Sequence, residues 1–169
     1  NYFDALPVDV QKGVLLHKHI DTFTDNHPIF KTSKKRLFSQ FRHYSAVIVD
    51  MFYDHFLAKN FQLYSETPLL EFSLEFYKIL EKHKAILPEK VVRVTPVIKR
   101  FNWLHSYADL EQLKSILNQM NNRTSYTTNL QDSVTALKKD YTLYKNEFFE
   151  FFEDIRQEVK RKKTEMGIV

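Results

Sequence analysis

The scarcity of glycine and proline constrains this chain more than any other feature, because tight turns depend on these two residues. The 169 residues include 2 Gly and 5 Pro, whereas an average chain has about 12% of the two together. A sandwich or barrel of many short strands needs a turn every few residues. The sequence therefore disfavours an all-β fold and favours long helices joined by few loops.

Apolar residues recur at helical spacing along the chain, which predicts an all-α domain of about seven helices. Pro96 predicts a kink or break in the fifth helix, because proline removes a helical hydrogen bond. A loop is expected over 121–125, and no repeat or linker divides the chain, so we interpret residues 1–169 as one domain. The expected helices are 9–24, 28–41, 44–60, 69–87, 89–106, 109–120 and 130 to beyond 159.

Composition excludes several classes of protein. The chain has no Cys, which removes disulfides, thiolate metal sites and cysteine nucleophiles. With 43% hydrophobic residues it is not a disordered chain, and no apolar run approaches the roughly 20 residues of a membrane span. We therefore expect a soluble cytoplasmic protein without a membrane or secretory segment. The net charge of +4 permits an acidic or phosphate-rich partner.

Ionisable residues interrupt the most apolar segment. Residues 44–60 are apolar on nearly every side, which predicts a buried helix, yet they include Asp50, Asp54 and His55. Asp50 and Asp54 are four residues apart and share one helix face. Buried carboxylates must be paired, protonated or bound to a metal, and two on one face repel each other unless a cation lies between them. The pattern therefore indicates a cation site, with His55 within reach.

The first predicted helix offers matching ligands. His17, Asp21 and Asp25 follow at four-residue intervals, so at about 100° per residue they fall within an arc of about 80°. One imidazole and several carboxylates on two helices suit a divalent cation such as Mn²⁺, Mg²⁺ or Fe²⁺. His19 points away from His17 and is left out of the predicted site.

Simpler interpretations of the same residues stay open. Asp25 could end one helix or cap the next. His17 and Asp21 could form an ordinary surface pair, and His55 could be a hydrogen-bonded core histidine. The basic runs at 34–36 and 160–163 could be ordinary solvated surface. The aromatic pairs at 148–149 and 151–152 could belong to the core or to an interface.

Three blocks of sequence stand out together: DVQKG at 9–13, HKHIDTFTD at 17–25 and VDMFYDHFL at 49–57. The His-x-x-x-Asp-x-x-x-Asp and Asp-x-x-x-Asp-His arrangements are specific in combination and weak singly. Together the blocks resemble the bacterial acyl carrier protein phosphodiesterases. Weaker similarity continues through 101–104, 117–120 and Arg123, so it covers most of the chain.

The resemblance implies an all-α enzyme distantly related to the His-Asp (HD) phosphohydrolases. Family members remove 4′-phosphopantetheine from holo acyl carrier protein with a divalent metal, typically Mn²⁺, leaving the apo carrier protein. A carboxylate such as Asp54 or Asp50 would orient or deprotonate the attacking water. Asp25 matches as a further candidate ligand. Carried over residue by residue, the implied metal ligands are His17, Asp21, Asp50, Asp54 and His55.

The implied partner is an acidic protein, so the positive net charge favours encounter by electrostatic steering. Arg93, Lys99 and Arg100 are the residues predicted to hold this substrate. Family members begin with a short apolar segment and a Gly-Asp-Phe motif, both upstream of anything that matches Asn1. The Asp of that motif is expected to belong to the site, so we expect this chain to carry an incomplete or empty metal site.

Two rival functions stay open. One is a non-catalytic helical module whose carboxylates are structural and whose basic patches bind an acidic partner. The other is a related metal phosphohydrolase acting on a nucleotide. A nucleic-acid binder is disfavoured, because the basic residues are scattered and no platform of alternating aromatic and basic residues is present.

Overall fold

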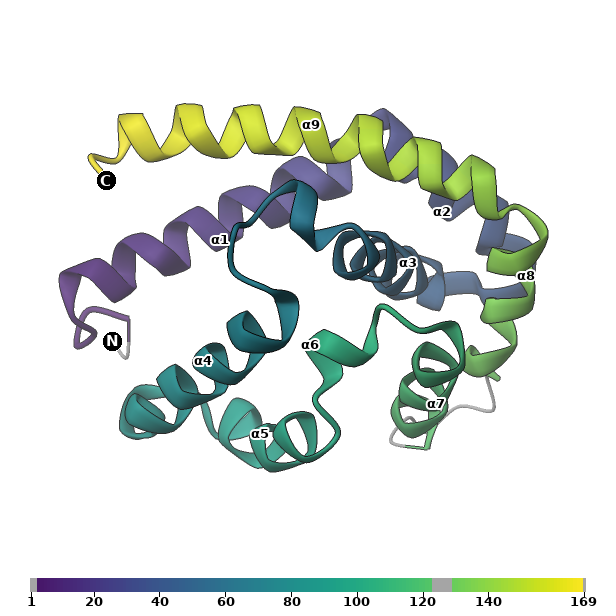
Figure 1. The fold of residues 1–169 in the computed structure, drawn as a ribbon. Helices are drawn as coiled ribbons and strands as arrows, with labels where there is room; N and C mark the ends of the chain where they lie inside the picture. Colours follow the sequence, from purple (N-terminus) through teal and green to yellow (C-terminus); the bar gives the residue numbers. More distant parts are fainter. Residues whose placement is uncertain (1–2, 123–128, 169) are drawn as a thin grey trace.

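The computed structural model describes residues 3–122 and 129–168, and all regular secondary structure within these residues is helical, with short 3-10 turns and no strand (Figure 1). The predicted all-α fold is confirmed. Of the predicted loop at 121–125, residues 123–125 lie outside the described residues. The α-helices are α1 (Val8–Asn26), α2 (Pro28–Phe41), α3 (Ser45–Lys59), α4 (Leu69–Lys82), α5 (Glu89–Arg100), α6 (Trp103–Ser106), α7 (Leu110–Asn121), α8 (Ser133–Lys139) and α9 (Tyr141–Glu165).

Helix boundaries follow local signals in the sequence. Pro28 occupies the first turn of α2, where its missing N–H would have had no helical partner. The Asp109 side chain caps α7 by accepting hydrogen bonds from the backbone N–H groups of Glu111 and Gln112, at 3.0 and 2.9 Å. These boundaries were predictable because each depends on a few neighbouring residues.

Two of the predicted helices are each divided in two, which raises the number of described α-helices from about seven to nine. The first break is not at Pro96, as predicted, but after Arg100, where Asn102 adopts a left-handed φ of 43°. Pro96 lies on the exposed side of α5, where water can bond the carbonyl that proline leaves without a partner. The second break is at Asp140, between α8 and α9.

Helix α3 lies at the centre of the fold. Its side chains Ile48, Val49, Phe52 and Phe56 are fully buried, and the helix contacts α2, α7 and α9. Figure 1 shows α3 end-on beneath the long α9, with α1 beside it and α4 and α5 at the lower left. A helix buried on nearly all sides needs apolar residues on nearly all sides, as the sequence predicted.

The aromatic pairs of α9 belong to the core. Phe148 and Phe151 are 1% and 5% exposed, and Phe149 and Phe152 are partly buried against them. Fully burying one such ring stabilises the fold by about 1.5–3 kcal/mol. The structural interpretation of these pairs is therefore confirmed.

A partly buried polar network connects α2, α3 and α9. Arg36 donates two hydrogen bonds to the Glu147 carboxylate, at 2.6 and 3.0 Å. Ser33 donates to the same carboxylate, so the Tyr53 hydroxyl, 3.0 Å from the Ser33 oxygen, donates to Ser33. The network fixes the position of Tyr53, whose ring lines the cavity described below.

None of the described helices is both long enough and apolar enough to cross a membrane.

Candidate active site

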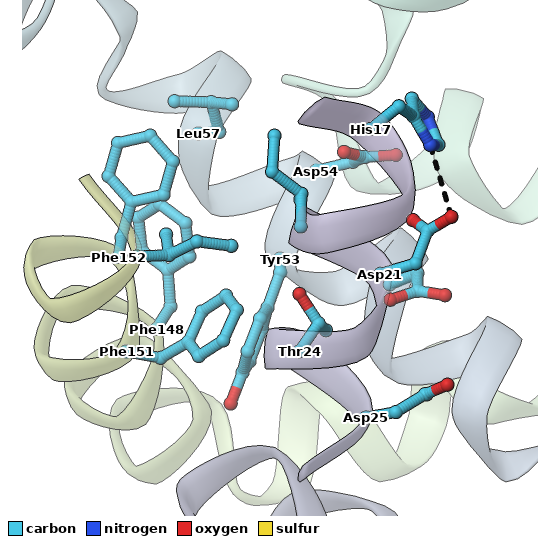
Figure 2. A pocket seen from close by; sticks show the side chains of 13 residues that line it. His17, Asp21, Thr24, Asp25, Tyr53, Asp54, Leu57, Phe148, Phe151 and Phe152 are labelled. Atoms are coloured by element: carbon cyan, nitrogen blue, oxygen red, sulfur yellow. Dashed lines mark hydrogen bonds and ion pairs between the residues drawn. The ribbon is translucent and has the colours of Figure 1, made fainter. Parts of the chain in front are cut away.

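A cavity of about 590 Å³ lies where α1, α3 and α9 meet. Its two sides differ in chemistry (Figure 2). Carboxylates and one imidazole from α1 and α3 form one side, and apolar side chains, mostly aromatic, form the other. A polar cluster against an apolar wall is the usual composition of a ligand site.

Helix α1 contributes the three residues predicted to share a face. His17, Asp21 and Asp25 all line the cavity, and the His17 ring nitrogen Nδ1 lies 3.0 Å from an Asp21 carboxylate oxygen. The two side chains are 76% and 60% exposed, so this surface pair contributes little to stability. Asp25 caps neither helix, because the residue between α1 and α2 that occupies both cap positions is His27.

Helix α3 contributes Asp50 and Asp54, which also line the cavity. Asp50 is exposed at its rim and Asp54 is half-buried. Burial raises the pKa of Asp54 to about 7, and the negative charge of Asp50 adds to the effect. Desolvation, together with the charges of Asp25 and Asp21, raises the pKa of Asp50 to about 6. Both carboxyl groups therefore exchange protons close to neutral pH.

His55 does not join this cavity, in contrast to its prediction as a metal ligand. It is fully buried, and its Nδ1–H donates to the Tyr107 carbonyl at 2.8 Å. Its Nε2 therefore accepts from the Tyr141 hydroxyl, at 2.9 Å. Burial lowers the pKa of His55, so the ring is neutral. With both ring nitrogens engaged, His55 has the role of a core histidine.

The apolar wall of the cavity was not predicted from the sequence as part of a site. Tyr53 from α3 and Phe148, Phe151 and Phe152 from α9 line it, and Figure 2 shows their rings on the side opposite His17 and Asp21. The spacing of the phenylalanines places them on one face of α9. That spacing was visible in the sequence, but it indicated core equally well.

The donor set can be tested against a divalent cation. Four carboxylates and an imidazole around one cavity are ligands that Mn²⁺, Mg²⁺ and Fe²⁺ accept. Within residues 3–122 and 129–168, however, no three His, Asp or Glu side chains are close enough together to hold a metal ion. The donors therefore fit a cation in type, whereas their side chains do not converge on one point.

The basic residues predicted to hold the substrate lie on α5, and none of them lines the cavity. Arg93 is bonded to Glu89 at 2.6 Å. Lys99 lies 3.8 Å from a Glu81 carboxylate oxygen, and the Arg100 guanidinium lies over the Phe101 ring. These cations already have partners within the chain.

The sequence is similar to proteins of one known family. A family model described as "Acyl carrier protein phosphodiesterase" matches residues 1–155. The chain is 28% identical over 163 residues to the acyl carrier protein phosphodiesterase of Enterobacter sp. (strain 638), covering 96% of this chain and 84% of that protein. It is 26% identical over 160 residues to the protein of the same name from Escherichia coli O6:H1, covering 94% and 83%. No solved structure matches.

Proposed function

Because the chain belongs to the acyl carrier protein phosphodiesterase family, we propose that it hydrolyses the phosphodiester that joins 4′-phosphopantetheine to holo acyl carrier protein. The products are the apo carrier protein and 4′-phosphopantetheine. The observation that carries this proposal is the cavity in which carboxylates of α1 and α3 face an apolar wall. Such a cavity has room for a phosphodiester beside an apolar arm.

Asp54 is the proposed proton-transfer residue. In the protein without a cation its pKa is about 7, so the carboxylate exchanges a proton with water near neutral pH. The water oxygen forms the new bond to phosphorus, and the bond from phosphorus to the serine oxygen of the carrier protein breaks. Asp54 then returns the proton to that serine oxygen, so the group ends the reaction in its starting state.

Asp50 has the supporting role in this scheme. Its charge, one helical turn from Asp54, helps to raise the pKa of Asp54 and so makes it a stronger base than an ordinary carboxylate. The apolar wall on the other side has the second supporting role. Its aromatic side chains offer apolar contact to the pantetheine arm and keep bulk water from that half of the cavity.

A divalent cation is part of the proposal, Mn²⁺ in the first place, with Mg²⁺ or Fe²⁺ as alternatives. His17, Asp21, Asp50 and Asp54 would hold it, and Asp25 is a further candidate. When bound, a cation of this kind neutralises charge on the phosphate oxygens and lowers the pKa of water. Supporting this assignment is the gathering of acidic side chains that, by themselves, repel one another.

The decisive experiment follows the mass of the carrier protein. Holo acyl carrier protein is incubated with this chain, with Mn²⁺ and with a chelator, and mass spectrometry measures loss of the prosthetic group. We expect conversion to the apo form with Mn²⁺, and loss of conversion in Asp54→Asn. Glu150→Gln, which removes an exposed carboxylate of α9, is the control and should retain activity.

Two results would contradict the proposal. If holo carrier protein stayed intact while a cyclic dinucleotide was hydrolysed, the chain would be a phosphohydrolase of another substrate class. If neither was hydrolysed but the carrier protein bound tightly, the non-catalytic module would be the better description.

A further inference from the structure

A second groove, of about 580 Å³, lies between α1 and the C-terminal half of α9. Its charged lining residues are all basic: Arg156, Lys160 and Lys163. Among the described residues, no carboxylate lines it. The groove therefore has the opposite charge to the acidic cavity next to it. Its apolar lining residues are Ile20, Phe152, Ile155, Val159 and Ile168.

The basic side chains form a stripe along α9. Positions 156, 160 and 163 fall within an arc of about 60° and span about 10 Å of helix axis. Cations that bind one phosphate group must converge on a point, whereas these are spread over two helical turns. Their spacing matches carboxylates that repeat every three or four residues along an acidic helix.

Two of the three cations, Lys160 and Lys163, are available to a partner, whereas Arg156 lies 3.4 Å from a Glu153 carboxylate oxygen. Elsewhere on α9, Arg161 is paired with Glu158 and Glu165, and Lys162 with Glu165. By contrast, in the described part of the chain neither Lys160 nor Lys163 has a carboxylate partner. A free ammonium group gains more from an incoming carboxylate than one that must first break an existing pair.

The groove is continuous with the candidate active site. Ile20, Phe152 and Ile155 line both cavities, and α1 packs against α9 along this side of the molecule (Figure 1). A protein segment lying in the groove would therefore be next to the carboxylates of α1 and α3.

We propose that this groove is the docking site for an acidic segment of the carrier protein, with Lys160 and Lys163 as its main anchors. The proposal rests on the proposed function, since it takes the carrier protein as the substrate. The stripe supplies charge complementarity, the apolar floor supplies contact area, and the shared side chains connect docking to chemistry. It places docking on α9, rather than on the paired cations of α5.

The test is charge reversal at the two free lysines. Lys160→Glu/Lys163→Glu should raise KM for holo carrier protein at least tenfold while kcat changes little. The matched control is Lys82→Glu/Lys90→Glu, which makes the same change of charge at two exposed lysines of α4 and α5 and should leave KM within twofold. Circular dichroism melts check that both variants fold.

Three further measurements separate docking from chemistry. A small phosphodiester without a carrier protein, bis(p-nitrophenyl) phosphate, should be hydrolysed equally by wild type and by the reversed variant. Wild-type KM for holo carrier protein should rise with salt, since exposed charges are screened over about 8 Å at physiological ionic strength, and the reversed variant should show a flatter dependence. Direct binding of apo carrier protein, measured by fluorescence anisotropy, should weaken in parallel.

The outcomes distinguish the two proposals. If wild type does not act on holo carrier protein, the proposed function fails. If wild type is active but the reversed variant keeps the wild-type KM and the same affinity for apo carrier protein, docking in this groove is refuted and the function stands. If the reversal instead changes the oligomeric state in size-exclusion chromatography, a second copy of the chain occupies the groove and docking is also refuted.

Discussion

Removing the Asp54 carboxylate should make the metal-free protein more stable above neutral pH. In the folded protein without a cation the pKa of Asp54 is about 7, against 3.8 for an ordinary aspartic acid side chain. Between these two pH values the folded state therefore holds a proton on Asp54 that the unfolded state has lost. The contribution of Asp54 to the free energy of unfolding is therefore highest at low pH and is lost as the pH rises through 7. At about 1.4 kcal/mol per pH unit, this loss of stability amounts to at most about 4 kcal/mol and is complete above pH 7.

The measurement compares wild type with Asp54→Asn in urea and thermal melts from pH 5 to pH 8, with a chelator present. Roughly 2–3 kcal/mol of the loss falls within this range. For a chain of this size, each kcal/mol shifts Tm by about 2–4 °C. Any fixed packing cost of the amide is the same at every pH. The difference between the two proteins should therefore grow in favour of the variant as the pH rises.

Glu150→Gln is the control, because it removes an exposed carboxylate from α9, and its difference from wild type should stay constant. Asp50 is exposed, so solvent screens its charge and we assign it no comparable free energy. Parallel stability curves for wild type and Asp54→Asn over the whole pH range would refute the reasoning.

The remaining predictions concern the metal, the core and the cavity rim. Mn²⁺ held by the acidic side of the cavity would, at 100 times its dissociation constant, stabilise wild type by about 2.7 kcal/mol and leave Asp54→Asn unchanged, as judged by Tm; an equal rise in both would place the ion elsewhere, and no rise in wild type would show that the metal site is incomplete. His55→Ala should lower stability by about 1–3 kcal/mol, because it leaves a buried carbonyl without a donor, while turnover per folded molecule persists. Glu147→Ala should cost about 1–3 kcal/mol in urea unfolding by leaving the partly buried Arg36 and the buried Ser33 without their acceptor. His17→Ala should abolish turnover on holo carrier protein yet change stability by less than about 0.5 kcal/mol, since the side chain is 76% exposed.

Much of the acidic half of the site could be predicted because helical periodicity is a local property. Residues four apart share a helix face wherever the helix is placed, so His17, Asp21 and Asp25 could be grouped from the sequence, as could Asp50 and Asp54. All of them line one cavity in the structure. The apolar character of α3 likewise identified the helix that the others surround.

What packs against each face was decided by contacts between distant parts of the chain. His55 follows Asp54 directly, yet the turn of about 100° between neighbouring residues directs it to Tyr107 and Tyr141 and away from the cavity. No local pattern specifies those partners, which lie 52 and 86 residues further along the chain.

The same reason explains the basic groove. The residues 160–163 have the composition of ordinary surface, and sequence reasoning assigned them that role. Only the packing of α1 against α9 places Lys160 and Lys163 beside the apolar floor and the acidic cavity. The sequence by itself determined which side chains could act together on one helix, and the tertiary structure determined which helices face one another, because helix pairing depends on side-chain contacts that close long loops of chain.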